Sequence, residues 1–127
     1  MTGALMRYHN KPDTGRHGRL AEPKIAKRLG GKTTLGSGAI DRDKGDINLP
    51  EFLIEAKTTL ADSISIKQDW LLKIYQEALE KHKEPAMAIN FVNEAGRSEK
   101  RQRWVAIPEH VFISMLDELR ESREHGR

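Results

Sequence analysis

Two charged residues, Glu55 and Lys57, stand two positions apart at the end of a short apolar run. That run predicts a buried strand over residues 51–57. Side chains alternate between the faces of a strand, so Glu55 and Lys57 point to the same side, roughly 6.5–7 Å apart along the strand, and Ala56 points into the core. A carboxylate and an ammonium group on one face suit the hydrolysis of a phosphodiester.

The chemistry needs a divalent ion and a second acid. A carboxylate binds a hard ion such as Mg²⁺, which polarises a phosphate and lowers the pKa of a bound water, and a lysine stabilises the charge that develops. One carboxylate holds Mg²⁺ poorly. Asp46 begins the preceding short strand, residues 46–48, and a hairpin would bring it to Glu55. A Glu-x-Lys pair on a strand is also often only an exposed ion pair. The rest of the sequence must therefore distinguish a catalytic pair from an exposed ion pair.

The charge distribution supplies part of that context. The first 45 residues hold ten Lys/Arg against four Asp/Glu, a net charge of +6, so the remainder carries −3 of the total of +3. A basic N-terminal third favours a polyanion as partner, most simply nucleic acid. The other interpretation is a solvated, flexible basic arm.

Length and composition limit the class of protein. The 127 residues fit one domain, and the absence of cysteine excludes disulfides, zinc-thiolate sites and thiol nucleophiles. No apolar run approaches the roughly 20 residues of a membrane span, and the N-terminus has no apolar stretch of signal-peptide length. We expect a cytoplasmic protein without a membrane partner.

The elements that must position these residues follow from periodicity and breakers. We expect an α/β fold, a mixed central β-sheet flanked by helices, in the order α-β-β-β-α-β-β-α. The first expected helix spans about 18–29, and it either begins near Glu22 or tolerates Pro23 in its first turn. The second spans 65–83 and has a broad apolar stripe. The last helix has Pro108 as its first position, and its expected buried face consists of Val111, Phe112, Met115, Leu116 and Leu119. The expected strands near the end are 86–92 and 102–107. Residues 1–17 are predicted to be a flexible basic arm, 18–120 a single domain and 121–127 a polar tail.

The pattern of Asp46 followed by Glu55-Ala56-Lys57 resembles that of the PD-(D/E)XK nucleases, whose restriction-endonuclease-like core has the order αβββαβ. Within that superfamily, residues 16–107 are most similar to small archaeal-type Holliday junction resolvases, including phage-encoded versions. Those proteins combine an acid on the first helix with a Ser/Gly segment before the aspartate. The matching positions are Glu22 and Ser37.

The resemblance implies a homodimer that nicks two opposing strands of a four-way junction. Asp46, Glu55 and the Ala56 carbonyl would bind Mg²⁺, with Mn²⁺ as a substitute, and Lys57 would serve the water. Glu22 would complete or tune the metal site. The chain departs from the family in having Pro23 directly after Glu22 and Gly45 before the aspartate.

Three further catalytic candidates each have a structural alternative. Glu22 in a first helical turn would favour the helix dipole without any catalytic role. Ser37 lies between glycines and could be a turn residue. Gln68 stands where related nucleases often place a glutamine, but it also completes a Ser-x-x-Gln capping box with Ser65. Trp70 and Tyr75 are interpreted as core residues.

Basic residues in two parts of the chain could contact DNA phosphates. If six of them do, affinity falls with the logarithm of the salt concentration at a slope near roughly −5. The cluster after residue 96 could equally be a solvated loop. The candidates are Arg7, Lys11, Arg16, Arg19, Lys32, Arg97, Lys100, Arg101 and Arg103.

The sequence therefore predicts a metal-dependent, structure-selective endodeoxyribonuclease that resolves four-way DNA junctions by paired nicks, in the cytoplasm, or in the host cytoplasm for a phage-encoded protein. Two alternatives stay open. One is a general nuclease of this fold that acts on linear duplex or ends. The other is a non-catalytic DNA-binding protein, although such a surface would gain from losing its acids.

Overall fold

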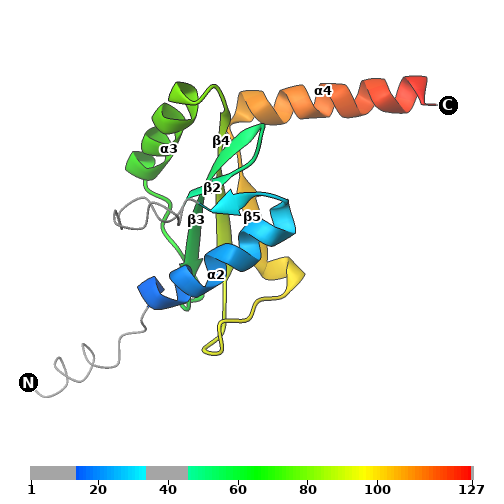
Figure 1. Ribbon diagram of the computed structural model, residues 1–127. Coiled ribbons are helices and arrows are strands. Elements are labelled where there is room, and N and C mark those ends of the chain that lie inside the picture. Colours follow the sequence, from blue (N-terminus) through cyan, green and yellow to red (C-terminus); the bar gives the residue numbers. More distant parts are fainter. Residues whose placement is uncertain (1–13, 34–45, 127) are drawn as a thin grey trace, which may run out of the picture.

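The computed structural model describes residues 14–33 and 46–126. Within these ranges the elements run α2, β1, β2, β3, α3, β4, η3, β5 and α4. The strands form one mixed sheet in the order β1-β2-β3-β4-β5. The predicted α/β class with helices beside a mixed sheet is confirmed. Figure 1 shows α2 and α3 beside the sheet and α4 extending away from it.

Helix α2, Thr14–Leu29, packs against the sheet through Ala21, Ile25 and Ala26. A glycine pair ends it. The N–H of Gly30 donates to the carbonyl of Lys27 (3.2 Å), and that of Gly31 donates to the carbonyl of Ala26 (2.8 Å). Gly30 has φ +80°, a conformation that costs glycine nothing because it has no Cβ.

The predicted start of this helix is wrong. It begins at Thr14, so residues 14–17, expected in the arm, are helical, and Pro23 lies inside the helix rather than in its first turn. Proline removes the hydrogen bond that residue 23 would donate to the Arg19 carbonyl. The exposed position of Pro23 and the buried residues on either side of it show that packing on the sheet outweighs this loss.

Strands β2, Asp46–Asn48, and β3, Phe52–Thr59, form an antiparallel hairpin. Its turn is closed by a hydrogen bond from the N–H of Leu49 to the carbonyl of Phe52 (2.9 Å). Strand β1, Lys32–Thr33, pairs with the outer side of β2. The predicted hairpin between the strands of Asp46 and Glu55 is confirmed.

Helix α3, Gln68–Glu80, connects β3 to β4, Glu84–Phe91, and these two strands are parallel. Parallel pairing requires such a crossover. On β3, Ile54 packs with residues of α2, and Leu53 packs with Ile74 and Ala78 of α3. The even-numbered side chains of β3 therefore face α2, and the odd-numbered ones face α3.

Helix α3 is shorter and less buried than predicted. It begins at Gln68 and ends at Glu80, instead of spanning 65–83, and only Ile74 and Ala78 are buried within it. The predicted apolar stripe is otherwise open to solvent, because no described element covers its outer part. The exposed residues of this stripe and its neighbours are Ile66, Leu71, Leu72, Tyr75 and Leu79.

Strand β5, Arg103–Ala106, pairs with β4 after the short 3-10 helix η3, Lys100–Gln102. Helix α4, Glu109–His125, then extends from the body (Figure 1). Pro108 is its N-cap, with ψ 149°, and not its first helical position. The helix also continues past Glu121 to His125, through most of the predicted polar tail.

The predicted burial of α4 is wrong except at Val111, which is 5% exposed. Phe112, Met115 and Leu119 are 55%, 50% and 47% exposed, and Leu116 is half-buried. The helix leaves the sheet after its first turn and has no further partner among the described residues. In the described ranges, no helix is both long enough and apolar enough to cross a bilayer.

Candidate functional site

Glu55 and Lys57 lie side by side on the α3 face of β3. The Lys57 Nζ atom is 3.4 Å from the Glu55 Oε2 atom. The side chain of Lys57 is 29% exposed and that of Glu55 is 20% exposed. The Lys57 ammonium also lies 4.2 Å from the ring centroid of Trp70, a half-buried residue in the first turn of α3. A carboxylate and an aromatic ring thus fix the ammonium group from two elements.

The register places Asp46 directly opposite Glu55. Hydrogen-bonded and non-hydrogen-bonded pairs alternate along an antiparallel ladder. Since Leu49 and Phe52 form a hydrogen-bonded pair, positions 46 and 55 form the closer, non-hydrogen-bonded kind. Directly opposite residues share a face of the sheet. Residue 46 therefore belongs to the face that bears Glu55 and Lys57.

The carbonyl of Ala56 points toward the edge of β3 that pairs with β2. Glu51 and Thr59 accept hydrogen bonds from β4 and its flanks, so the odd-numbered carbonyls of β3 face β4 and the even-numbered ones face β2. The described part of β2 begins at Asp46, and none of its residues lies opposite Ala56. An oxygen donor is thus directed to the side of β3 on which positions 46 and 55 pair.

Glu22 approaches from the other side of the sheet. It is 5% exposed, on the face of α2 that packs on Ile54 and its neighbours. The described part of β2 begins with Asp46, opposite Glu55, and the residues Ala56–Thr59 of β3 extend beyond that pair. Glu22 and Glu55 belong to opposite faces of the sheet. Glu22 is not in a first helical turn, so its interpretation as a dipole-stabilising residue is wrong.

Gln68 is the first residue of α3 and is exposed. Its predicted capping box with Ser65 is wrong, because Lys67 is the N-cap and no side chain caps the helix. Gln68 therefore keeps no capping role, and it stands in the same helical turn as Trp70. Ser37 lies outside the described residues.

The predicted DNA contacts divide into four groups. Arg7 and Lys11 lie outside the described residues, and Arg16 and Arg19 belong to α2, where only the backbone is described. Lys32 is exposed on β1 at the edge of the sheet.

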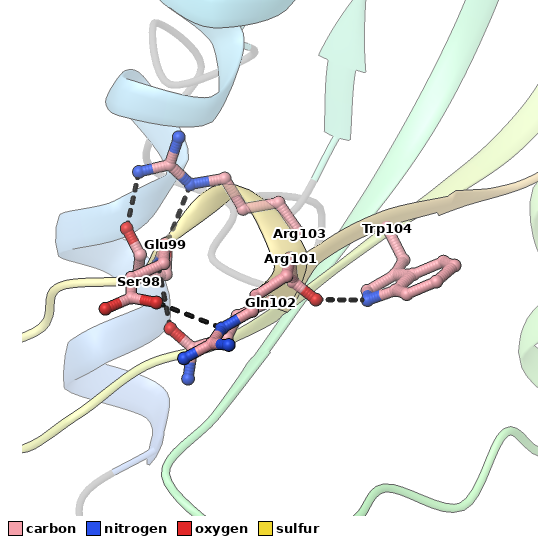
Figure 2. Close-up of polar contacts among 6 residues, drawn as sticks. All are labelled: Ser98, Glu99, Arg101, Gln102, Arg103 and Trp104. Atoms are coloured by element: carbon pink, nitrogen blue, oxygen red, sulfur yellow. Dashed lines mark hydrogen bonds and ion pairs between the residues drawn. The ribbon is translucent and has the colours of Figure 1, made fainter.

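The last group surrounds η3. Figure 2 shows Arg103 anchored on Ser98, through Nε to Oγ (2.9 Å) and through a second bond to the carbonyl. Arg101 instead pairs with Glu99 at 3.1 Å, and its carbonyl accepts a bond from the exposed Trp104. Arg97 and Lys100 are exposed.

Sequence reasoning missed two features of these surfaces. Trp70 was assigned to the core, yet its ring packs on Lys57. Arg28 was not selected, yet it donates to Asn90 at the far end of β4 (3.2 Å). Burial and the neighbouring Arg103 lower the pKa of Arg28 below its ordinary value. Both contacts join residues distant in sequence, and no local pattern could have indicated them.

The oxygen donors at this site fit a hard divalent ion. Glu55 supplies a carboxylate and Ala56 a carbonyl, the ligand types that Mg²⁺ prefers. Among the described side chains, no three acidic, histidine or cysteine residues form a group that could hold a metal. The side chain of Asp46 is outside that set, so the described donors can supply only part of a metal site.

Comparisons with protein-family models, with curated protein sequences and with solved structures find no match for this chain. What it does is therefore inferred from its own residues and geometry.

Proposed function

We propose that this chain is a metal-dependent endodeoxyribonuclease that resolves four-way DNA junctions by paired nicks. The main support is the register that sets Asp46 opposite Glu55 on the strand that also bears Lys57. Two acidic positions and one lysine on one face, beside a carbonyl that points toward the β2 side of β3, suit phosphodiester hydrolysis better than an exposed ion pair. An isolated ion pair would need neither Asp46 nor the half-buried Trp70.

In this proposal Asp46, Glu55 and the Ala56 carbonyl hold Mg²⁺, or Mn²⁺ in its place, and Glu22 completes or tunes the site. The bound ion would polarise the phosphate and lower the pKa of a water. During hydrolysis that water adds to phosphorus and one P–O ester bond breaks, so negative charge grows on the phosphate oxygens. The Lys57 ammonium, fixed by Glu55 and Trp70, is placed to stabilise that charge.

The core in this proposal is restriction-endonuclease-like. In its support, a helix, three strands, a second helix and a strand follow one another in that order from α2 to β4. The acids lie on the hairpin of the second and third strands, and the second helix covers Lys57.

A homodimer would supply the second nick, because one active site cuts one strand at a time. An exposed apolar face on α3 and α4 supports this part of the proposal, since large apolar patches mark sites of protein association. The basic residues of α2 and of the η3 loop would contact the arms of the junction. We place the protein in the cytoplasm, that of the host if a phage encodes it.

The test is incubation with a synthetic four-way junction and with a linear duplex of the same sequence, in Mg²⁺ and in EDTA. We expect symmetric nicks in the junction only, and no cutting in EDTA. Equal cutting of both substrates would indicate a general nuclease. No cutting in either Mg²⁺ or Mn²⁺ would leave a DNA-binding protein of this fold and overturn the enzymatic proposal.

Neutralising either acid tests the site itself. Asp46→Asn and Glu55→Gln should abolish cleavage but leave junction binding intact or tighter, because a negative charge beside the phosphates is lost. Glu51→Gln is the matched control, since Glu51 is an exposed acid in the turn of the same hairpin. Cleavage by Glu55→Gln at the rate of Glu51→Gln would show that the site is assigned wrongly.

A further inference from the structure

A basic pocket lies on the α2 side of the sheet, away from the face of Glu55 and Lys57. It has a volume of about 280 Å³ and lies between α2 and the loop that joins β4 to β5. Its polar lining consists of Lys24, Arg28, Arg97, Arg103, Asn90 and Ser98, a set of four cations and two neutral residues. No acidic side chain of the described residues lines it. Its size is below that of most sites for drug-sized ligands, which favours a small group.

Neutral partners hold the two central cations of this basic pocket. Arg28 donates to Oδ1 of Asn90 at 3.2 Å, and Asn90 is itself only 3% exposed. Arg103 donates to Oγ and to the carbonyl of Ser98 (Figure 2). These bonds orient the guanidinium groups but leave their positive charge uncompensated. Arg101, on the same loop, differs from them because the carboxylate of Glu99 compensates its charge.

The arrangement has an electrostatic cost. Arg28 is exposed as a whole, and the partial burial of its guanidinium group, together with the nearby charge of Arg103, lowers its pKa, so the folded protein slightly disfavours its charged form. Because arginine stays protonated at neutral pH, this cost is present under ordinary conditions. Groups arranged against their own stability often mark a binding site.

We propose that the basic pocket binds a phosphate group, held by the guanidinium groups of Arg28 and Arg103. A guanidinium group presents its N–H donors in a fork that matches phosphate oxygens, and Arg28 and Arg103 approach from two elements. A phosphate dianion or phosphodiester would offset the repulsion between these two cations. Asn90 and Ser98 serve as positioning residues.

This phosphate site is separate from the proposed catalytic site. Asn90 pairs in register with Thr58, next to Lys57, but belongs to the face that α2 covers. The phosphate could come from the backbone of DNA that passes over both faces, or from a free phosphate compound. Phosphate binding requires neither metal nor cleavage, so its test does not depend on the proposed nuclease activity.

The first experiment measures thermal unfolding of the full chain with inorganic phosphate, against sodium chloride at equal ionic strength. We expect phosphate to raise the Tm of the wild type and of Arg120→Gln, the matched control, which removes an exposed guanidinium group on α4 that does not line the pocket. Arg28→Gln should weaken phosphate binding about tenfold, the loss expected for one charge-assisted contact. Lys24→Gln, an exposed change in the same pocket, provides a second variant.

The second experiment identifies the source of the phosphate. Binding of a short DNA duplex is measured in EDTA over a range of salt concentrations. If DNA supplies the group, Arg28→Gln should reduce the slope of log affinity against log salt by about 1, and Arg120→Gln should not. Loss of inorganic phosphate binding with an unchanged DNA slope would indicate a free phosphate compound. If Arg28→Gln and Lys24→Gln leave both kinds of binding unchanged, the proposal is wrong.

Discussion

Lys57 is the residue whose surroundings distinguish the candidate site from an ordinary surface ion pair. Exposed lysines keep their rotamer freedom, and a surface pair contributes only about 0–1 kcal/mol. Lys57 is instead 3.4 Å from a carboxylate oxygen and 4.2 Å from the centre of the Trp70 ring. Two partners on two elements fix one ammonium position before any substrate binds, which is what a residue that stabilises developing charge requires.

Trp70→Leu tests this positioning. The substitution keeps an apolar side chain but removes the cation–π contact, which is worth about 0.5–2 kcal/mol. We expect single-turnover junction cleavage in Mg²⁺ to slow by roughly 3- to 30-fold if that energy is lost from the transition state.

Trp70→Phe retains an aromatic face and should restore most of the rate. Thermal unfolding of both variants separates positioning from folding. Equal rates for the leucine variant and the wild type would show that the ring does not position Lys57.

The sequence predicted those parts of the site that depend on local periodicity. The period of a strand puts Glu55 and Lys57 on one face, and a short turn dictates the hairpin that brings Asp46 opposite Glu55. The contact of Trp70 with Lys57 depends on where α3 begins and how it lies on the sheet. The predicted start of α3 at Ser65 was three residues too early, and the predicted capping box between Ser65 and Gln68 was wrong for the same reason.

At the scale of elements, the glycine pair after α2 determines how closely β2 approaches that helix. A Cβ atom on Gly31 would lie 2.6 Å from the backbone oxygen of Asn48 and 3.0 Å from Cγ2 of Ile47. A Cβ on Gly30 would meet nothing within 4 Å, but its φ is +80°. Gly31 is thus required by close packing, and Gly30 by backbone conformation.

Gly31→Ala should destabilise the fold by about 1–3 kcal/mol, because the backbone of β2 must move away. Gly30→Ala should cost roughly 1–2 kcal/mol through its left-handed conformation, without displacing β2. Urea unfolding measures both values.

Junction cleavage then separates the two causes. Under conditions where both proteins are folded, Gly31→Ala should cut more slowly than Gly30→Ala, since only the former shifts the strand that bears Asp46. If the two variants cut equally well, the position of β2 does not control the site.

Amphipathic periodicity predicted the helices but overestimated their burial. Leu72 and Leu79 of α3 and Met115 of α4 have apolar neighbours at helical spacing, yet each is at least half exposed. A periodic stripe indicates that a helix buries a face, and does not say whether the partner surface belongs to the same chain. Helix α2 shows the opposite error. The sequence rules for proline predicted a later start, but the helix extends through Pro23 because it packs on the sheet.

At the scale of the whole molecule, α3, β5 and α4 each expose large apolar side chains. A groove lined by Ile66, Leu72, Tyr75 and Ile107 lies between α3 and β5, and α4 begins beside it. Trp104 on β5 is 62% exposed. A chain with 32% charged residues that still exposes such side chains is expected to cover them by association.

Met115→Asp tests whether a second copy covers these side chains. Met115 lies on the apolar stripe of α4, and Ser114, also exposed, points away from it by the geometry of a helix. Both Met115→Asp and Ser114→Asp add one negative charge at a neighbouring position. Sedimentation velocity should therefore find a monomer for Met115→Asp and a dimer for Ser114→Asp and the wild type.

The consequence for activity follows from the geometry of paired nicks. A monomer with an intact Asp46–Glu55–Lys57 site should still nick a junction but should lose the coordination of the two cuts, so nicked intermediates would accumulate. A supercoiled cruciform plasmid shows this directly, since coordinated cuts linearise it and single cuts relax it. If Met115→Asp remains dimeric, or linearises the plasmid as the wild type does, α4 is not part of the interface that pairs the two sites.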